Sequence, residues 1–331
     1  MAGRRVLITG VGSHVGGTLA RRLERDPEID YVAGLDTRKP SVPLEQTEVI
    51  DADIRNPVLG KLFPQTRVDT VVHNQIVRQP GPGVSARAMH DINVIGSLQL
   101  LAACEKSDTI RTIVIRGSAG VYGAEPHAPQ FFGEEMTRLF PLRTRFQRDV
   151  GEIENYFETY SRRHPEVTCT MLRYQPAIGP SVDTQITRYL SRPLVPTYMG
   201  FDPRLQFVHE DDAVEALVAA IKRPVRGAVN VAGEGTIGLT RMVRLAGKPT
   251  LPIASPLFGP LVQAGKRFGL NESFSDDFSR LLRYGRAVDT TRLTDEVGFQ
   301  PHYSTVAAVQ DYLAKQRGRR VVPPIRQVVP G

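Results

Sequence analysis

The sequence has no tryptophan, only two cysteines, and no apolar run of the roughly 20 residues that a membrane span needs. The cysteines, Cys104 and Cys169, lie in apolar contexts without metal-binding spacing, so no metal site is expected. Buried reduced thiols are typical of a reducing compartment. The opening MAGRR runs directly into the strand-like VLITG, without the apolar core of a signal peptide. Together these features predict a soluble, cytoplasmic protein.

Lysine is also scarce, with seven lysines against thirty-five arginines in a chain of net charge +7. The basic residues are mostly dispersed, without an aromatic-interleaved stripe, so nucleic-acid binding is not expected. No lysine occurs between Lys106 and Lys222, a gap that affects the catalytic interpretation below.

Short β-branched runs alternate with helical patterns through the first half of the chain. The predicted strands include RRVLITG, DYVAGLD, EVIDADI, DTVVHN, RTIVIRG and VTCTMLRY. Such alternation predicts βαβ crossovers and an α/β fold with a doubly wound parallel sheet. After Gly179-Pro180 the pattern loosens and proline becomes more frequent.

A glycine-rich turn, ITGVGSHVG, follows the first predicted strand and opens a helix. Gly10, Gly12 and Gly16 allow a tight turn, a close approach of the backbone to a pyrophosphate, and close helix packing. The helix start would then present free N–H groups to the phosphates. The predicted cofactor-binding residues of this turn are Gly10, Gly12, Ser13, His14, Val15 and Gly16.

An acid follows at the end of the second predicted strand, where it can contact a ribose. Asp36 stands in GLDTRKP, at the distance expected for a carboxylate that hydrogen-bonds the ribose 2′-hydroxyl. A carboxylate would repel a 2′-phosphate, so NAD is favoured over NADP, although Arg38 and Lys39 keep NADP open. We therefore expect a dinucleotide-binding Rossmann domain over 1–175, with returns near 205–233. A substrate or lid region would cover 176–204 and 234–318, and a tail 319–331.

These motifs resemble those of the extended short-chain dehydrogenases/reductases, also called NAD-dependent epimerase/dehydratases, to which UDP-glucose 4-epimerase belongs. TGVGSHVG is similar to the family's TGxxGxxG, although Ser13 stands at the middle glycine. DADI resembles the family's Asp-Ile pair, which implies adenine contacts by Asp53 and the Ile54 backbone. VVHNQ matches the strand-end HLAA only at the histidine, which places the larger Asn74 beside the cofactor. NVIGS resembles NVxGT, in which the residue matching Asn93 is usually structural.

GSAGVYG resembles the family's SSxxVYG, which implies that Ser118 hydrogen-bonds the reacting hydroxyl or carbonyl. The family's YxxxK should follow, because its Tyr takes the substrate proton and its Lys lowers the Tyr pKa. Aligned on FQRDVGEIE, however, these positions hold Phe146 and Val150, and no YxxxK occurs in the chain. The Asn of the family's LRxxN matches Pro176.

Substitute bases near this motif are Tyr122, His127, Glu134, Glu135 and Asp149, although none sits one helical turn from another suitable group. Around 145–157 an apolar helical stripe replaces the catalytic face: Phe146, Val150, Ile153 and Phe157. That stripe fits core packing or a homodimer interface, which family members commonly form through this helix.

Three functions remain open. The first is an NAD-binding epimerase or dehydratase that acts on a nucleotide-sugar-like substrate with non-standard catalytic residues. The second is a degenerate NAD(H)-binding regulatory or scaffold protein. The third is redox chemistry on a less polar substrate, with the proline-rich segment from Pro249 to Leu261 lining an apolar entrance or simply packed as a loop.

Overall fold

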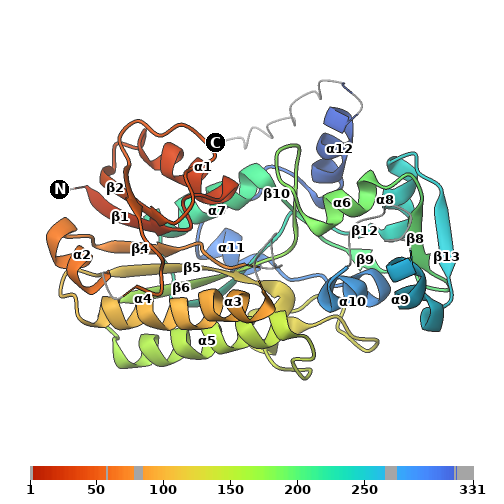
Figure 1. The fold of residues 1–331 in the computed structure, drawn as a ribbon, viewed down its shortest axis with the longest axis horizontal. Helices are drawn as coiled ribbons and strands as arrows, with labels where there is room; N and C mark the ends of the chain where they lie inside the picture. The colour runs from red at the N-terminus through yellow and green to blue at the C-terminus, as the bar shows by residue number, and fades with distance from the viewer. Residues whose placement is uncertain (1–2, 57–58, 78–84, 265–273, 317, 319–331) are drawn as a thin grey trace.

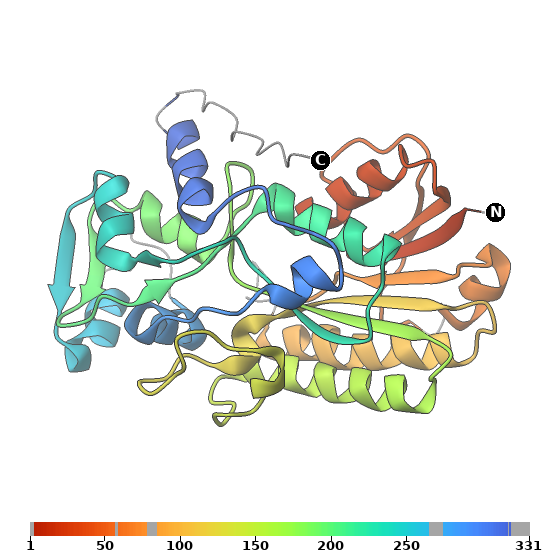
Figure 2. The same ribbon diagram turned by 180° about the vertical axis from the view of Figure 1, so that it is seen from behind.

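The computed structural model describes residues 3–56, 59–77, 85–264, 274–316 and 318. The tail expected over 319–331 lies outside this part of the chain. Two units lie side by side, a large sheet with its helices and a smaller region built by the later chain (Figures 1 and 2).

Seven parallel strands form the central sheet in the order β11-β6-β5-β4-β1-β2-β3. Their bounds are β1 Arg4–Thr9, β2 Ile29–Asp36, β3 Glu48–Asp51, β4 Thr70–His73, β5 Thr112–Ser118, β6 Thr168–Tyr174 and β11 Gly227–Val231. The strand order reverses between β1 and β4, and ligands of such sheets bind outside the carboxyl ends at that point. The predicted α/β, doubly wound Rossmann fold is confirmed.

Helices cover both faces of the sheet (Figure 1). On one face α1 (His14–Leu23) packs against α7 (Glu210–Lys222), and on the other α4 (Gly96–Glu105) packs against α5 (Arg145–Arg163) together with α2 (Leu59–Thr66). In α1 the apolar stripe that faces the sheet is buried, through Val15, Leu19 and Leu23. The sheet therefore lies between two apolar cores.

The helix before α4 is locally unwound. It runs from α3 (Ala86–His90) through a π-helical turn, η1 (Asp91–Ile95), into α4. Asn93 in this turn accepts a hydrogen bond from Val77 N at 2.7 Å and donates to Val77 O at 2.8 Å. Both bonds fasten the chain that follows β4, so Asn93 has the structural role that the family resemblance implies.

The apolar stripe on α5 packs into two different cores. Thr144 caps the helix, and Gln147 completes a capping box. Ile153 and Phe157 enter the core beneath the sheet, whereas Phe146 and Val150 enter a smaller cluster beyond its carboxyl edge.

The smaller region packs around its own apolar core. Its strands pair as β7 (Ala177–Ile178) with β10 (Val208–His209), β9 (Arg204–Leu205) with β12 (Ile237–Gly238), and β8 (Val195–Tyr198) with β13 (Thr250–Ile253). Its helices are α6 (Gln185–Ser191), α8 (Leu239–Leu245), α9 (Ser255–Ala264), α10 (Asp276–Tyr284) and α12 (Thr305–Gln316). The short α11 (Thr291–Asp295) lies against β11 of the large sheet.

Candidate active site

The turn between β1 and α1 brings Gly10 very close to its neighbours. Gly10 has a φ of +74°, and a Cβ on it would lie 3.0 Å from Gln75 Cα. A Cβ on Gly16 would lie 2.2 Å from the Gly10 carbonyl oxygen, closer than real side chains come. Within the described chain, the N–H groups of His14 and Val15 have no hydrogen-bond acceptor. The start of α1 therefore offers donors to an anion.

Ser13 and Asn74, which both depart from the family pattern, contact each other across this turn. Ser13 Oγ accepts a bond from Gly16 N at 3.1 Å and donates to Gly10 O at 2.8 Å. Asn74 Nδ2 donates to Ser13 Oγ at 3.0 Å and to Gly10 O at 3.2 Å. Asn74 Oδ1 is buried and has no partner in the described part of the structure. The turn is thus held by two polar side chains, and one buried acceptor is left for a ligand.

Asp36, at the carboxyl end of β2, lies against the same turn. Its Oδ2 accepts a bond from Gly12 N and its Oδ1 one from Arg38 N, both at 3.0 Å. A Cβ on Gly12 would lie 2.6 Å from Arg38 O. The Arg38 side chain is exposed, and its Nε lies 3.6 Å from Asp36 Oδ1. The carboxylate is therefore fixed beside the turn, where the sequence predicts the adenosine ribose.

Asp53 and Ile54 follow β3. The Asp53 carboxylate forms an ion pair with Arg55 at 2.5 Å, and the bonds from Arg55 lower the pKa of Asp53. Ile54 is fully buried, and a Cβ on Gly96 at the start of α4 would lie 2.6 Å from its Cγ2. The adenine contacts implied for both residues remain a prediction.

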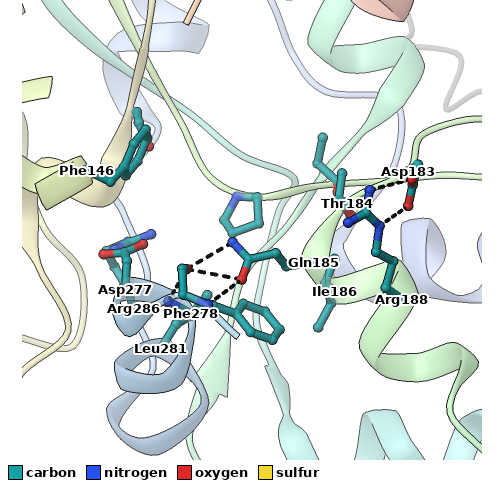
Figure 3. Close-up of a pocket in the computed structure, with 14 residues that line it drawn as sticks. Phe146, Asp183, Thr184, Gln185, Ile186, Arg188, Asp277, Phe278, Leu281 and Arg286 are labelled. Carbon is teal, nitrogen blue, oxygen red and sulfur yellow. Dashed lines mark hydrogen bonds and ion pairs between the residues drawn. The ribbon is translucent and has the colours of Figure 1, made fainter. Parts of the chain in front are cut away.

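A cavity of about 280 Å³ lies beyond the carboxyl end of β5, between the large sheet and the smaller region (Figure 3). Ser118 and Phe146 line it from the sheet side. The remaining lining residues are Pro176, Ala177, Asp183, Thr184, Gln185, Ile186, Arg188, Ser275, Asp277, Phe278, Leu281 and Arg286. Ser118 Oγ accepts a bond from Gly120 N at 3.1 Å, so its hydroxyl hydrogen can be donated into the cavity.

Phe146 and Val150 occupy different environments, although both belong to one apolar cluster. Phe146 is 9% exposed and reaches the cavity wall, whereas Val150 is 0% exposed and does not line the cavity. At position 146 the cavity thus meets an aromatic ring without a hydroxyl. At position 150 there is no charge, and the surroundings are apolar.

The substitute bases proposed from the sequence do not line this cavity. The Tyr122 hydroxyl donates to Asn230 Oδ1 at 2.7 Å and accepts from Arg173 Nη1 at 2.8 Å, and burial raises the pKa of Tyr122 to about 12. Glu134 accepts a bond from Asn230 N, and burial raises its pKa. Both groups therefore belong to a buried network rather than to the cavity.

The other three candidates also lie elsewhere. The Asp149 carboxylate accepts a bond from His90 Nδ1 at 2.7 Å, between α5 and α3. His127 and Glu135 are exposed on the chain between β5 and α5. Their nearness to the motif in sequence does not bring them to the site.

Two charged residues that sequence reasoning missed do line the cavity. Asp277 comes from the first turn of α10, and its Oδ1 accepts a bond from Gln147 Nε2 at 2.8 Å. Arg286 is 5% exposed and bonds to Gly123 O at 3.2 Å and to Gln175 Oε1 at 3.4 Å. Burial lowers the pKa of Arg286, and the negative charge of Asp277 opposes this effect. No sequence signal near 118–157 indicates either residue.

The expectation that Pro249 to Leu261 lines an apolar entrance is wrong for this cavity, because none of its lining residues comes from that segment. The segment instead forms β13 and most of α9, and Phe258 stacks on Tyr198 with ring centroids 3.8 Å apart. Ile253 and Phe258 of this segment are buried, whereas Leu251 and Leu257 are exposed. β13 and α9 lie at the far end of the smaller region (Figure 1).

In the part of the chain that the structure describes, no group of three or more His, Cys, Asp or Glu side chains is placed to hold a metal ion. Nor does that part of the chain contain a helix with the length and apolar character of a membrane span.

The profile of the NAD dependent epimerase/dehydratase family matches residues 6–232. The chain therefore belongs to this family. An uncharacterized protein of Mycobacterium tuberculosis (strain H37Rv) is 37% identical over 323 residues, which cover 96% of this chain and 85% of that protein.

Two solved structures are similar in fold. The UDP-glucose 4-epimerase of Thermotoga maritima, solved with UDP-glucose, has a TM-score of 0.72 at 18% identity, covering 95% of this chain and 99% of that one. The dTDP-glucose 4,6-dehydratase of Bacillus anthracis, solved with NAD, has a TM-score of 0.71 at 16% identity, covering 95% and 97%. At these sequence identities, the two matches show similarity of fold alone.

Proposed function

We propose that this protein binds NAD at the glycine-rich turn and oxidises or reduces a nucleotide-sugar-like substrate in the adjoining cavity, without the family's Tyr–Lys pair. NAD is supported by the family, by the free N–H groups at the start of α1, and by the unpartnered Asn74 Oδ1. When bound, NAD supplies the hydride acceptor. Gly10, Gly12, Ser13, His14, Val15, Gly16, Asp36, Asp53, Ile54 and Asn74 would hold it.

The residues that line the cavity are the main support for a nucleotide-sugar-like substrate. Ser118 and Phe146 share a cavity with hydrogen-bonding side chains of the smaller region, among them Thr184, Gln185 and Ser275. Its volume, about 280 Å³, approaches the roughly 300–1,000 Å³ of small-molecule sites. Such lining suits a polyhydroxylated ligand, and the related solved structures contain UDP-glucose or act on a dTDP-sugar.

NAD is proposed rather than NADP because of Asp36. Its carboxylate lies beside Gly12, where it would repel a 2′-phosphate. Arg38 pairs with that carboxylate but is exposed, so it could turn toward a 2′-phosphate only by leaving Asp36.

A second candidate function is NAD(H) binding without turnover. It is favoured by Val150, because the position of the family's lysine is fully buried among apolar side chains. Both candidates are compatible with a homodimer, since Ile95 and Leu98 are exposed on η1 and α4.

The experiment that separates the two candidates uses the purified full chain. Bound NAD(H) is quantified after denaturation, and turnover of UDP-glucose and UDP-galactose is followed by chromatography. The proposal expects stoichiometric cofactor and interconversion or dehydration of a nucleotide sugar. Retained cofactor with no product from any nucleotide sugar supports the non-catalytic candidate, and absence of bound or bindable NAD contradicts both.

A further inference from the structure

The cavity is lined by two carboxylates, which differ in how they are bonded. Asp183 forms a bidentate ion pair with Arg188, with distances of 2.5 Å and 2.6 Å. Asp277 accepts one bond, through Oδ1, and its Oδ2 has no hydrogen-bond or ion-pair partner among the residues described. Asp183 is therefore occupied by its own salt bridge, whereas Asp277 keeps an oxygen for a ligand.

Asp277 is held by the neighbour of Phe146. Gln147 is 1% exposed, and its Oε1 accepts bonds from Arg143 N at 2.8 Å and Thr144 N at 3.2 Å. These two bonds fix the orientation of the amide, so its Nε2 must point toward Asp277 as a donor. The helix that carries the apolar ring at position 146 thus positions a carboxylate that comes from α10.

Arg286 provides the positive charge that the cavity otherwise lacks on this side. Its guanidinium bonds to Gly123 O and Gln175 Oε1, and no carboxylate of the described chain lies within ion-pair distance of it. In Figure 3 Arg286 and Asp277 lie together below Phe146, at one end of the drawn cavity. A base, a cation and the Ser118 hydroxyl therefore line one space.

We propose that Asp277 is the general base of this protein and that Gln147 is its positioning residue. This inference rests on the proposed function. Asp277 Oδ2 would accept the proton of a substrate hydroxyl, and NAD, when bound, would supply the acceptor for the hydride on the same carbon, so that a C–H and an O–H bond would break and a carbonyl would form. Ser118 donates a hydrogen bond to the oxygen of that carbonyl. In the reverse direction Asp277 returns the proton.

The test compares the wild-type chain with Asp277→Asn, which keeps the shape of the side chain, and with Asp276→Asn. Asp276 is an exposed carboxylate in the same first turn of α10 and does not line the cavity, so it is the matched control. Each NAD-loaded protein is mixed with UDP-glucose or UDP-galactose, and reduced nicotinamide is followed by fluorescence between pH 4 and 9. Cofactor content, nucleotide-sugar affinity by calorimetry and thermal unfolding are measured in parallel.

We expect Asp277→Asn to slow reduction by roughly 10²–10⁴-fold, the usual contribution of a positioned base. Its cofactor content and nucleotide-sugar affinity should stay within about threefold of wild type. The fall in wild-type rate on acidification should be absent from Asp277→Asn, and Asp276→Asn should behave as wild type.

Wild-type rates in Asp277→Asn, or equal losses in both variants, overturn the assignment of Asp277 and leave the proposed function intact. A wild-type protein that binds NAD and nucleotide sugar but forms neither reduced nicotinamide nor a converted nucleotide sugar overturns both proposals together.

Discussion

Gln147 and Asp277 lie 130 positions apart in the sequence and are joined by a hydrogen bond of 2.8 Å between Nε2 and Oδ1. The bond connects α5 of the large sheet domain to α10 of the smaller region. It runs alongside a cavity that Phe146 and Ser118 also line. The hydrogen bond that joins the two regions therefore ends on a carboxylate that lines the proposed active site.

Two variants of Gln147 separate its two roles. Gln147→Leu removes both the capping box of α5 and the bond to Asp277, whereas Gln147→Glu keeps an acceptor for the cap but sets a like charge against Asp277. We expect Gln147→Leu to lower the free energy of unfolding by about 1 kcal/mol and Gln147→Glu to preserve more of it. Both should lower kcat about tenfold with little change in KM. Loss of stability in Gln147→Leu with an unchanged kcat in both variants would show that the residue is only a cap.

Gly16→Ala should abolish NAD binding, because the added Cβ would lie 2.2 Å from Gly10 O and 2.8 Å from Asn74 Nδ2. The turn must open to admit it, which moves the free N–H groups of α1. Gly60→Ala is the control, since nothing lies within 4 Å of a Cβ on that helical glycine. Calorimetry should show at least tenfold weaker NAD binding for Gly16→Ala and no change for Gly60→Ala. Equal affinities would place the cofactor elsewhere.

Replacing Asp36 should alter the choice of cofactor. Asp36→Ser removes the charge that would repel a 2′-phosphate, and we expect the Kd for NAD to rise about tenfold and that for NADP to fall. Asp51, which pairs with Asp36 in the register of β2 and β3 and is exposed, gives the matched control Asp51→Ser. Fluorescence titration with both reduced cofactors makes the comparison. Unchanged selectivity in Asp36→Ser would mean that this carboxylate does not face the ribose.

Reintroducing the two residues of the family's Tyr–Lys pair should change the free energy of unfolding by different amounts. Phe146 borders the cavity, so Phe146→Tyr can direct its hydroxyl there and should change the free energy of unfolding by less than about 1 kcal/mol. Val150→Lys places an ammonium among apolar side chains and should cost on the order of 3–5 kcal/mol without cofactor. Val49→Lys, at a valine that is 45% exposed, should be nearly neutral. Urea unfolding measures all three, and a neutral Val150→Lys would show that this position is open to solvent.

Acid should destabilise the protein through His73, whose ring bonds to Thr9 Oγ1 at 2.7 Å and to Ser97 Oγ at 2.8 Å. Complete burial lowers the pKa of His73 to about 4. The unfolded chain, with an ordinary pKa near 6.5, then binds this proton more readily, so stability falls as the pH drops from about 6.5 toward 4. The loss from this group should be roughly 3 kcal/mol.

A His73→Gln variant should lack that pH-dependent component, whereas His127→Gln, at an exposed histidine, should retain it. Denaturant titrations at several pH values measure both. An identical pH dependence in His73→Gln and wild type would contradict the role assigned to the buried ring.

The sequence predicts the sheet domain well because its signals are local. Buried strands, the glycine turn and the acid at the end of β2 each occupy a short segment, and the spacing of each is explained by one local structure. The stripe on α5 is also local, but its division between two cores depends on where the sheet ends, which periodicity does not show.

The site was predicted only in part. Ser13 and Asn74 look like separate departures from the family pattern, and only the fold shows that they contact each other. Asp277 and Arg286 come from a region without strong motifs and reach the cavity through long-range packing. The substitute bases that the sequence suggests lie near the missing tyrosine along the chain, whereas Asp277 lines the cavity from α10 of the smaller region.

The most direct test of the account is a crystal structure of the full chain with NAD and UDP-glucose. The account predicts the pyrophosphate of NAD at the start of α1, its nicotinamide ring beside Phe146, and a sugar hydroxyl between Ser118 Oγ and Asp277 Oδ2. A cofactor bound away from Gly10 and Gly16, or a sugar whose hydroxyls do not reach Asp277 at saturating ligand, would contradict it.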